Sequence, residues 1–516
     1  MKKILMMIAV VCCSLSVRAQ LSTSVKTESG KIEGYQADGL TIFKGVPFAA
    51  PPVGQLRWQA PQPVKPWSNV LKCTEFAKSP IQAGDPSKCS EDCLYLNIWS
   101  PAKSATDKLP VLVWIYGGGF AFGSTNDWVS DGTALAQKGV ILVSIAYRVG
   151  KIGFFAHPEL TRESKNHVSG NYGIQDQIAA LKWVKRNIAR FGGNPDKITI
   201  FGESEGGISV SMLCASPLMK GVITGAISES GGSFGPTRPT TYPGENMKTL
   251  AQAEQDGEAF ARGVGAKSIA DLRKMPASAF TSGGMGGGNG WPIVDGYVIP
   301  GDQYELYEQG RFNDIPVLIG YNSDEGASFM REKDPKRYRE SVVQRYGQFA
   351  DKLMEAYPVT ETAVPKSARD LMRDAAFGWH TWSWARLQAE KGKSKVFLYY
   401  FDQHPDEPAG SPRYGMGSPH GQEVQYVFQH VFRPEQQSDI PLMKAMGDYW
   451  VNFAKYGDPN GPGVPQWPAF TKDVHNTMYL TGPEPHVGPV PDEKSLEVLN
   501  SYFEWRRTDE GRRWAK

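Results

Sequence analysis

The stretch DKITIFGESEGGISV, residues 196–210, decides the fold of this chain. Its first residues are prone to form a strand, and the small residues after Ser204 suit the start of a helix. Between them, residues 202–206 form the pattern G-x-S-x-G, which is typical of a nucleophile elbow. In such an elbow a tight turn strains the serine backbone and exposes the hydroxyl group, and the flanking glycines let strand and helix crowd together. A glycine-flanked serine in an ordinary turn is the alternative.

Apolar runs around this stretch predict a buried sheet. Residues 111–116 (VLVWIY) and 140–147 (VILVSIAY) are continuously apolar, as in strands covered on both faces of a mainly parallel sheet. Residues 174–191 have apolar positions at helical spacing, and further apolar strands are predicted at 315–321 and 395–401. Strands that alternate with helices indicate a doubly wound α/β sheet, with active residues beyond the carboxyl ends of the strands.

The later part of the chain is less regular. Residues 331–395 are predicted to be largely helical, and we expect Trp379, Trp382 and Trp384 there to pack in the core or in a cap rather than around a cofactor. The glycine-rich segment 283–290 (GGMGGGNG) follows no strand and opens no helix, so it indicates a surface loop rather than a phosphate-binding loop.

Length and composition describe an ordinary globular protein. The chain has 516 residues and a formal net charge of +2, which argues against nucleic acid or an anionic membrane as the main partner. We find no linker between separate cores, so residues 20–516 are predicted to form one domain. The histidines show no metal-ligand spacing such as H-x-x-x-H, and no metal or organic cofactor is expected.

Residues 1–19 have the composition of a secretory signal peptide. Two lysines precede an apolar run, and Val17-Arg18-Ala19 fits a cleavage site before Gln20. The run is too short to span a bilayer, and lipid attachment at Cys12 or Cys13 is the lesser possibility. We therefore expect an exported protein, periplasmic or secreted, without an integral membrane segment after processing.

Removal of the signal peptide leaves four cysteines, Cys73, Cys89, Cys93 and Cys214. Export permits disulfides, and three of the four lie within one 21-residue stretch, which favours a local disulfide. The spacing alone does not choose the pairing. Cys214, on the helix predicted after the elbow, is interpreted as a buried small hydrophobe.

A serine nucleophile needs a base and an oxyanion site. Gly117–Gly119 directly follows the first apolar strand, and its backbone N–H groups, with that of Glu205, are suited to hold an oxyanion. Asp324 and Glu325 follow the strand 315–321, and spacing does not choose between these two acids. The base must be a histidine, and the chain order serine, acid, histidine leaves His380, His404, His420, His430, His475 and His486. Of these, His420 lies in the loop GSPHGQE, where an accessible imidazole is favoured.

Several long motifs, in one order along nearly the whole mature chain, resemble the type-B carboxylesterase and cholinesterase family of α/β hydrolases. The matching segments are FKGVPFAAPPVGQLRW (43–58), SEDCLYLNIW (90–99), WIYGGGFAFG (114–123), residues 170–207, IPVLIGYNSDEG (315–326), HGQEVQYVF (420–428) and NFAKYGDP (452–459). The resemblance implies a large, mostly parallel central sheet flanked by helices, with cap and loop insertions that form a gorge. It also implies hydrolysis of small-molecule carboxylic esters through an acyl-enzyme.

The resemblance assigns roles that the residues alone leave open. It implies Ser204 as nucleophile, Glu325 as acid and His420 as base. Some relatives have lost this triad and serve as binding proteins, so a weakly active or inactive binding protein is the alternative function. The oligomeric state cannot be predicted from this sequence.

The resemblance also implies supporting structure. The oxyanion hole is formed by Gly118, Gly119 and the N–H of Glu205. A Cys73–Cys93 disulfide is implied, which leaves Cys89 over. Two structural ion pairs are carried over with the motifs, and they are Glu91 with Arg148 and Arg57 with Asp176.

Two positions depart from the family pattern. The elbow usually has alanine where this chain has Glu205. We hypothesise that its carboxyl group, if buried near His420, has a raised pKa or stabilises the imidazolium, and that it disfavours anionic substrates or fills part of the acyl pocket. The loop between Cys73 and Cys93 carries Phe76 but no tryptophan, whereas cholinesterases bind choline with a tryptophan from this loop. This absence favours a general carboxylesterase over a cholinesterase.

Overall fold

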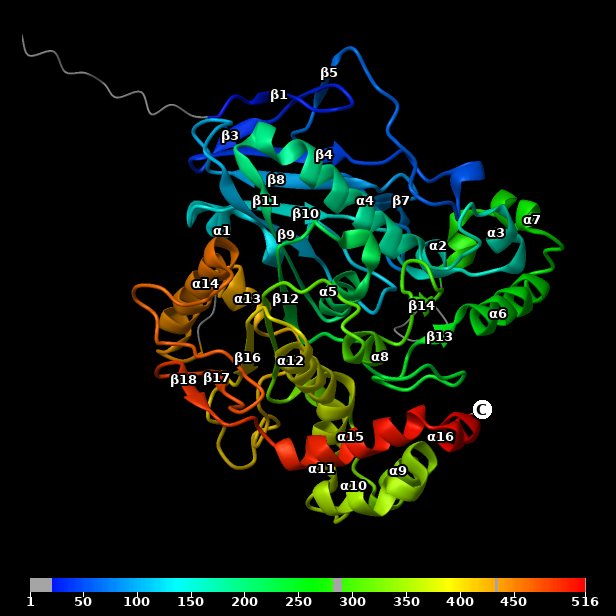
Figure 1. Cartoon of the computed structure of the whole chain (residues 1–516), viewed down its shortest axis with the longest axis vertical. Coiled ribbons are helices and arrows are strands. Elements are labelled where there is room, and N and C mark those ends of the chain that lie inside the picture. Colours follow the sequence, from blue (N-terminus) through cyan, green and yellow to red (C-terminus); the bar gives the residue numbers. More distant parts are fainter. Residues whose placement is uncertain (1–20, 282–289, 432–434, 516) are drawn as a thin grey trace, which may run out of the picture.

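A computed structural model describes residues 21–281, 290–431 and 435–515. Its centre is an 11-stranded sheet that crosses the molecule (Figure 1). In spatial order the strands are β18 (His486–Gly488), β17 (Thr477–Leu480), β16 (Val396–Phe401), β15 (Val317–Asn322), β12 (Gly225–Glu229), β11 (Gly193–Glu203), β9 (Leu109–Ile115), β10 (Ile141–Ile145), β8 (Tyr95–Ser100), β4 (Leu40–Pro47) and β3 (Tyr35–Ala37).

The sheet is parallel in its middle and antiparallel at both edges. The seven strands from β17 to β10 run parallel to their neighbours, whereas β18, β8, β4 and β3 pair in antiparallel fashion. Every residue of β10, β12, β15 and β16 is buried, as expected for strands covered on both faces. The predicted doubly wound α/β sheet is therefore confirmed.

Short strands form three smaller sheets. They are β1 (Ser24–Lys26), β2 (Lys31–Glu33) and β5 (Val70–Lys72) in one sheet, β6 (Ser79–Pro80) with β7 (Cys89–Ser90), and β13 (Lys248–Thr249) with β14 (Ile293–Val294).

Helices connect and cover the strands. They are α1 (Thr133–Gln137), α2 (Gly150–Phe154), α3 (Pro158–Glu163), α4 (Tyr172–Asn187), α5 (Glu205–Ala215), α6 (Leu250–Gly263), α7 (Ile269–Lys274), α8 (Gln303–Glu308), α9 (Pro335–Tyr346), α10 (Ala350–Ala356), α11 (Val364–Arg373), α12 (Trp379–Lys391), α13 (Val424–Val427), α14 (Asp439–Tyr456), α15 (Glu493–Arg507) and α16 (Asp509–Trp514). Helices α9 and α10 pack with α15 at the end of the molecule opposite the first strands (Figure 1).

The elements predicted from periodicity are present, with shifted ends. The helix predicted at 174–191 is α4 followed by the 3₁₀ helix Ile188–Phe191, and it ends at Gly192, whose φ of 83° is accessible to glycine. The segment predicted to be helical from 331 divides into α9, α10, α11, a π-helical turn at Asp374–Gly378, and α12. Its three tryptophans are 0–3% exposed, which confirms core packing.

The predicted ion pairs are wrong in their partners. Arg57 Nε lies 2.6 Å from Glu91, and Arg148 Nη2 lies 2.7 Å from Asp176. The reason is a close backbone approach at the start of α4, because a Cβ atom at Gly173 would lie 2.5 Å from the Arg148 carbonyl oxygen. This approach brings Asp176 onto Arg148.

The predicted Cys73–Cys93 disulfide is not formed in the structure. All four cysteines after the predicted signal peptide are free thiols. The Cys73 thiol instead points to the Gly45 carbonyl, with its Sγ 3.9 Å from the oxygen. Cys214 is fully buried in the core, as predicted.

Two sequence predictions fall outside the described residues. The signal peptide is one, and the glycine-rich loop 283–290 is the other, except for its last residue. Within the described ranges, no helix is both long enough and apolar enough to cross a membrane.

Candidate active site

The elbow has the geometry that its glycines predict. Ser204 lies between β11 and α5 with φ 56° and ψ −124°, a conformation that is strained for a residue with a side chain. A Cβ atom at Gly202 would lie 2.6 Å from the Ile115 carbonyl oxygen, and one at Gly206 would lie 2.1 Å from it. Strand β9 therefore packs directly on the turn, and only glycine fits at these two positions.

The ends of parallel strands β11, β15 and β16 bring the three predicted triad residues together. Ser204 follows β11, Glu325 begins the 3₁₀ helix after β15, and His420 lies in the loop after β16. His420 Nε2 lies 2.8 Å from Ser204 Oγ, and His420 Nδ1 lies 2.5 Å from Glu325 Oε2. Because the carboxyl ends of parallel strands share one edge of the sheet, residues far apart in the sequence meet there.

The structure distinguishes the two adjacent acids. Glu325 is fully buried, and its second oxygen accepts hydrogen bonds from the Ser230 hydroxyl at 2.6 Å and the Asn322 N–H at 2.7 Å. Asp324 turns away and pairs with Arg369, with Nε 2.9 Å from Oδ1. Of these two adjacent acids, Glu325 is the one in contact with His420.

Other histidines predicted from chain order have different partners. His380 is buried, accepts the Phe234 N–H at 3.0 Å, and has its pKa lowered to about 3 by burial. His404 pairs with Asp402 at 3.2 Å, and His475 pairs with Glu493 at 2.7 Å. None of these three contacts Ser204.

Carboxyl groups that were not predicted surround the histidine. Glu203 Oε1 lies 3.2 Å from His420 Nε2, and burial raises the pKa of Glu203 to about 8. Glu423 accepts a hydrogen bond from the side chain of Asn322, and burial raises its pKa to about 7. Both lie inside quoted motifs, Glu203 next to the serine and Glu423 three residues after the histidine, so their position was a usable signal.

The charges around His420 favour its protonated form. Burial alone would lower the pKa of His420, but Glu203, Glu325 and Glu205 raise it to about 10. The imidazole also packs against two rings, with centroids 5.0 Å from Phe329 and 4.7 Å from Phe377. These contacts fix the orientation of the ring.

The glycine turn after β9 lies beside the serine. A Cβ atom at Gly117 would lie 3.0 Å from the Ser204 Cβ, and Gly118 and Gly119 have positive φ angles of 119° and 66°. The Gly118 N–H, predicted to be an oxyanion donor, donates to Glu205 Oε2 at 3.0 Å. The side chain of Glu205 therefore lies at this turn, a position that the sequence did not predict.

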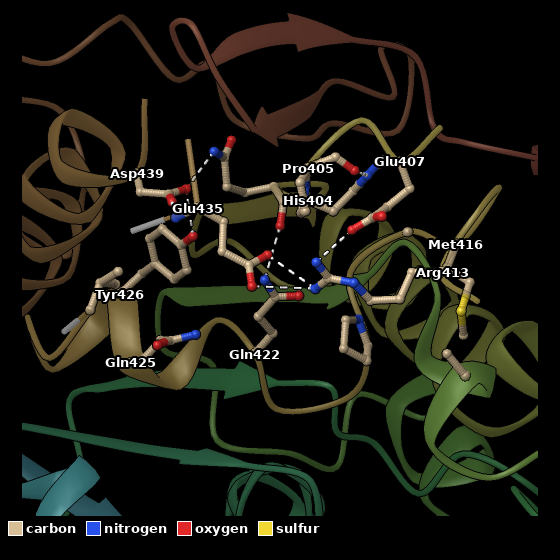
Figure 2. A pocket seen from close by; sticks show the side chains of 15 residues that line it. His404, Pro405, Glu407, Arg413, Met416, Gln422, Gln425, Tyr426, Glu435 and Asp439 are labelled. Carbon is tan, nitrogen blue, oxygen red and sulfur yellow. Dashed lines mark hydrogen bonds and ion pairs between the residues drawn. The ribbon is translucent and has the colours of Figure 1, made fainter. Parts of the chain in front are cut away.

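A cavity of about 270 Å³ lies beside the elbow. Its wall includes Gly119 and Glu205, and aromatic and apolar side chains line much of the rest, namely Ile208, Trp291, Phe329, Met372 and Phe377. A second cavity, of about 320 Å³, is lined by residues on both sides of His420 in the chain, Pro419 and Gln422 among them (Figure 2). Arg413 in the wall of this second cavity forms ion pairs with Glu407 and with Glu435. Its charge is therefore already balanced by side chains of the same cavity.

Among the described residues, no group of three or more histidine, cysteine, aspartate or glutamate side chains could hold a metal ion. The side chains at this site are the serine, the histidine and four carboxyl groups, those of Glu203, Glu205, Glu325 and Glu423.

An elbow serine on a mostly parallel sheet, with a histidine and an acid at neighbouring strand ends, defines an α/β hydrolase. Comparisons with known proteins agree. The Carboxylesterase family matches residues 21–498. A fumonisin B1 esterase of Sphingopyxis macrogoltabida is 37% identical over 86% of this chain and 84% of its own length, and a cocaine esterase of Oryctolagus cuniculus is 34% identical over 90% and 92%.

Solved structures give the same result. A PNB esterase superimposes with a TM-score of 0.79 at 31% identity, covering 93% of this chain and all of the other. The chain belongs to the carboxylesterase family, and it is a carboxylic ester hydrolase.

Proposed function

We propose that Ser204, His420 and Glu325 hydrolyse carboxylic esters by two-step acyl transfer. His420 takes the hydroxyl proton as Ser204 attacks the ester carbonyl, and Glu325 orients the imidazole and stabilises its cation. The alcohol leaves with a proton from His420. Water then attacks the acyl-enzyme with the same base, which releases the acid and restores the serine.

The oxyanion is assigned to the N–H groups of Gly118, Gly119 and Glu205. Glycine suits this position because nothing beyond the backbone blocks a substrate carbonyl. The single observation that carries the mechanism is the continuous contact from Glu325 through His420 to Ser204, at 2.5 and 2.8 Å.

The proposed substrates are small esters with an apolar or aromatic group. The cavity beside Ser204 supports this class, because aromatic and aliphatic side chains form much of its wall. The named relatives act on different esters, a fumonisin and cocaine among them, so their names do not choose one substrate for this chain.

Hydrolysis of p-nitrophenyl esters, from acetate to decanoate, tests the proposal when Ser204→Ala is assayed beside the parent. We expect turnover of short or medium esters by the parent, a loss of at least about 10³-fold in the variant, and labelling of Ser204 by a fluorophosphonate. A parent that is inert to every ester and to the fluorophosphonate would instead favour the alternative of a binding protein.

We also propose that the chain is exported and cleaved before Gln20. The support is the charged start, the apolar run and the small-x-small site of residues 1–19. Amino-terminal sequencing of the protein from its native cells should begin at Gln20. An intact Met1 in the mature protein would contradict export by this route.

A further inference from the structure

The side chain of Glu205 reaches back over its own elbow. One oxygen, Oε2, accepts two hydrogen bonds, from the Ser204 hydroxyl at 2.7 Å and from the Gly118 N–H at 3.0 Å. An oxygen that accepts from the glycine turn and also touches the serine lies where the proposed mechanism puts the carbonyl oxygen of the substrate.

This contact also uses the serine proton. Ser204 has one hydroxyl proton, and its oxygen lies within hydrogen-bond distance of both Glu205 and His420. If the proton is donated to Glu205, then His420 Nε2 must be the donor to Ser204, and a protonated imidazole cannot act as the base. The contact with Glu205 therefore describes a resting state from which attack on an ester cannot begin.

The cavity beside the elbow can receive the Glu205 side chain when it leaves this position. Its side chain is also part of the wall of the 270 Å³ cavity, where Ser233, Thr241 and Asn246 offer hydroxyl and amide groups. A rotation of the side chain into that cavity would free the Gly118 N–H and return the serine proton to His420.

We propose that the Glu205 carboxylate occupies the oxyanion hole of the resting enzyme as a tethered mimic of the acid product, and that a substrate must displace it. This inference rests on the proposed function of Ser204 and His420. Two consequences follow, because a tethered carboxylate competes with any ligand for the hole. The parent reacts slowly with small ligands, and free carboxylate products inhibit it weakly.

Covalent labelling tests the first consequence. The second-order rate constant for a small fluorophosphonate should rise about tenfold or more in Glu205→Ala, because a competing charge-assisted hydrogen bond is removed while the backbone N–H remains. Glu205→Asp is the matched control, since it keeps the negative charge but is one methylene too short to hold the same position. We expect the labelling rate constant to rise in Glu205→Asp as well.

Product inhibition tests the second consequence. Butyrate should inhibit p-nitrophenyl butyrate hydrolysis at least about tenfold more strongly in Glu205→Ala and in Glu205→Asp than in the parent, with competitive kinetics. If butyrate inhibition becomes stronger in Glu205→Ala but not in Glu205→Asp, then the charge near His420 is responsible and not occupancy of the oxyanion hole. That result would overturn the inference.

Failure of this inference can be distinguished from failure of the proposed function. Equal labelling and equal butyrate inhibition in an active parent and in an active Glu205→Ala enzyme would contradict this inference alone. If neither parent nor variants react with the fluorophosphonate or with any ester, the proposed function fails and this inference fails with it.

Discussion

The Nδ1 atom of His420 lies 2.5 Å from Oε2 of Glu325, although the two residues are 95 positions apart in the chain. The other oxygen of the same carboxyl group is held by Asn322 and Ser230. Glu325 can therefore accept the imidazole N–H only in one orientation, which leaves Nε2 facing Ser204. This relationship makes Glu325 a testable part of the site.

Substitution Glu325→Gln should lower kcat by about 10³- to 10⁴-fold. The amide oxygen would face the two donors at Asn322 and Ser230, so the amide nitrogen would face His420 Nδ1 and favour the tautomer that cannot accept the serine proton. Kinetics with p-nitrophenyl butyrate measure the loss.

The neighbouring acid is the matched control. Asp324→Asn weakens an ion pair with Arg369 but keeps an oxygen for the Gly417 N–H. It should lower thermal stability and leave kcat near the parent value. Equal losses of kcat in the two variants would contradict the role given to Glu325.

The pH dependence of kcat/KM should show a base with a high pKa. His420 acts as a base only when it has lost its proton, and its pKa is raised to about 10, so kcat/KM should increase from neutral pH toward that value. Glu203 becomes negative above about pH 8, the range in which His420 deprotonates, so Glu203→Gln should lower the His420 pKa and move the rise to lower pH.

A buried acid that does not contact His420 provides the control for this profile. Glu229 accepts a hydrogen bond from the Trp450 ring N–H at 2.7 Å, and burial raises its pKa well above the ordinary value. Glu229→Gln should leave the profile in place. A parent profile already flat from pH 7 upward would contradict the raised pKa.

The crowding of the elbow predicts a sharp difference between two glycines. Gly206→Ala should destabilise the protein by about 1–3 kcal/mol and lower activity, because its Cβ atom would lie 2.1 Å from the Ile115 carbonyl oxygen. Gly263→Ala, in open space at the end of α6, should change stability by less than about 1 kcal/mol. Thermal unfolding and ester hydrolysis check both, and an undisturbed Gly206→Ala enzyme would refute the close approach.

The buried ion pairs predict which charges are coupled. Removing Asp176 from its fully buried pair with Arg148 should cost about 3–5 kcal/mol of unfolding free energy. Double-mutant cycles should show coupling between Arg148 and Asp176 and between Arg57 and Glu91. Coupling between Arg148 and Glu91 instead would support the pairing predicted from the motifs.

Much of the fold could be predicted because its signals are local. The apolar runs at 111–116 and 140–147 became β9 and β10, and the stop after residue 191 marks the end of the α4 region. Glycine spacing around Ser204 predicted the tight turn, because only a residue without Cβ permits that contact with β9.

Partners across the fold were harder to predict. Motifs located Arg57, Glu91, Arg148 and Asp176 but paired them wrongly, since pairing depends on which backbones touch. The Cys73–Cys93 disulfide, carried over by resemblance, is likewise absent, and the Cys73 thiol points to Gly45 instead.

The sequence by itself determined the elbow around Ser204 and the sheet, because turn chemistry and apolar periodicity depend on neighbouring residues. It offered two acids and several histidines for the rest of the site, and only the resemblance to a known family chose Glu325 and His420 among them. Only the tertiary structure decided what each side chain contacts. It turned Asp324 toward Arg369, surrounded His420 with carboxyl groups, and placed the Glu205 carboxylate on the Gly118 N–H. The physical reason is that direction and distance between side chains depend on how strands far apart in sequence align at one edge of the sheet.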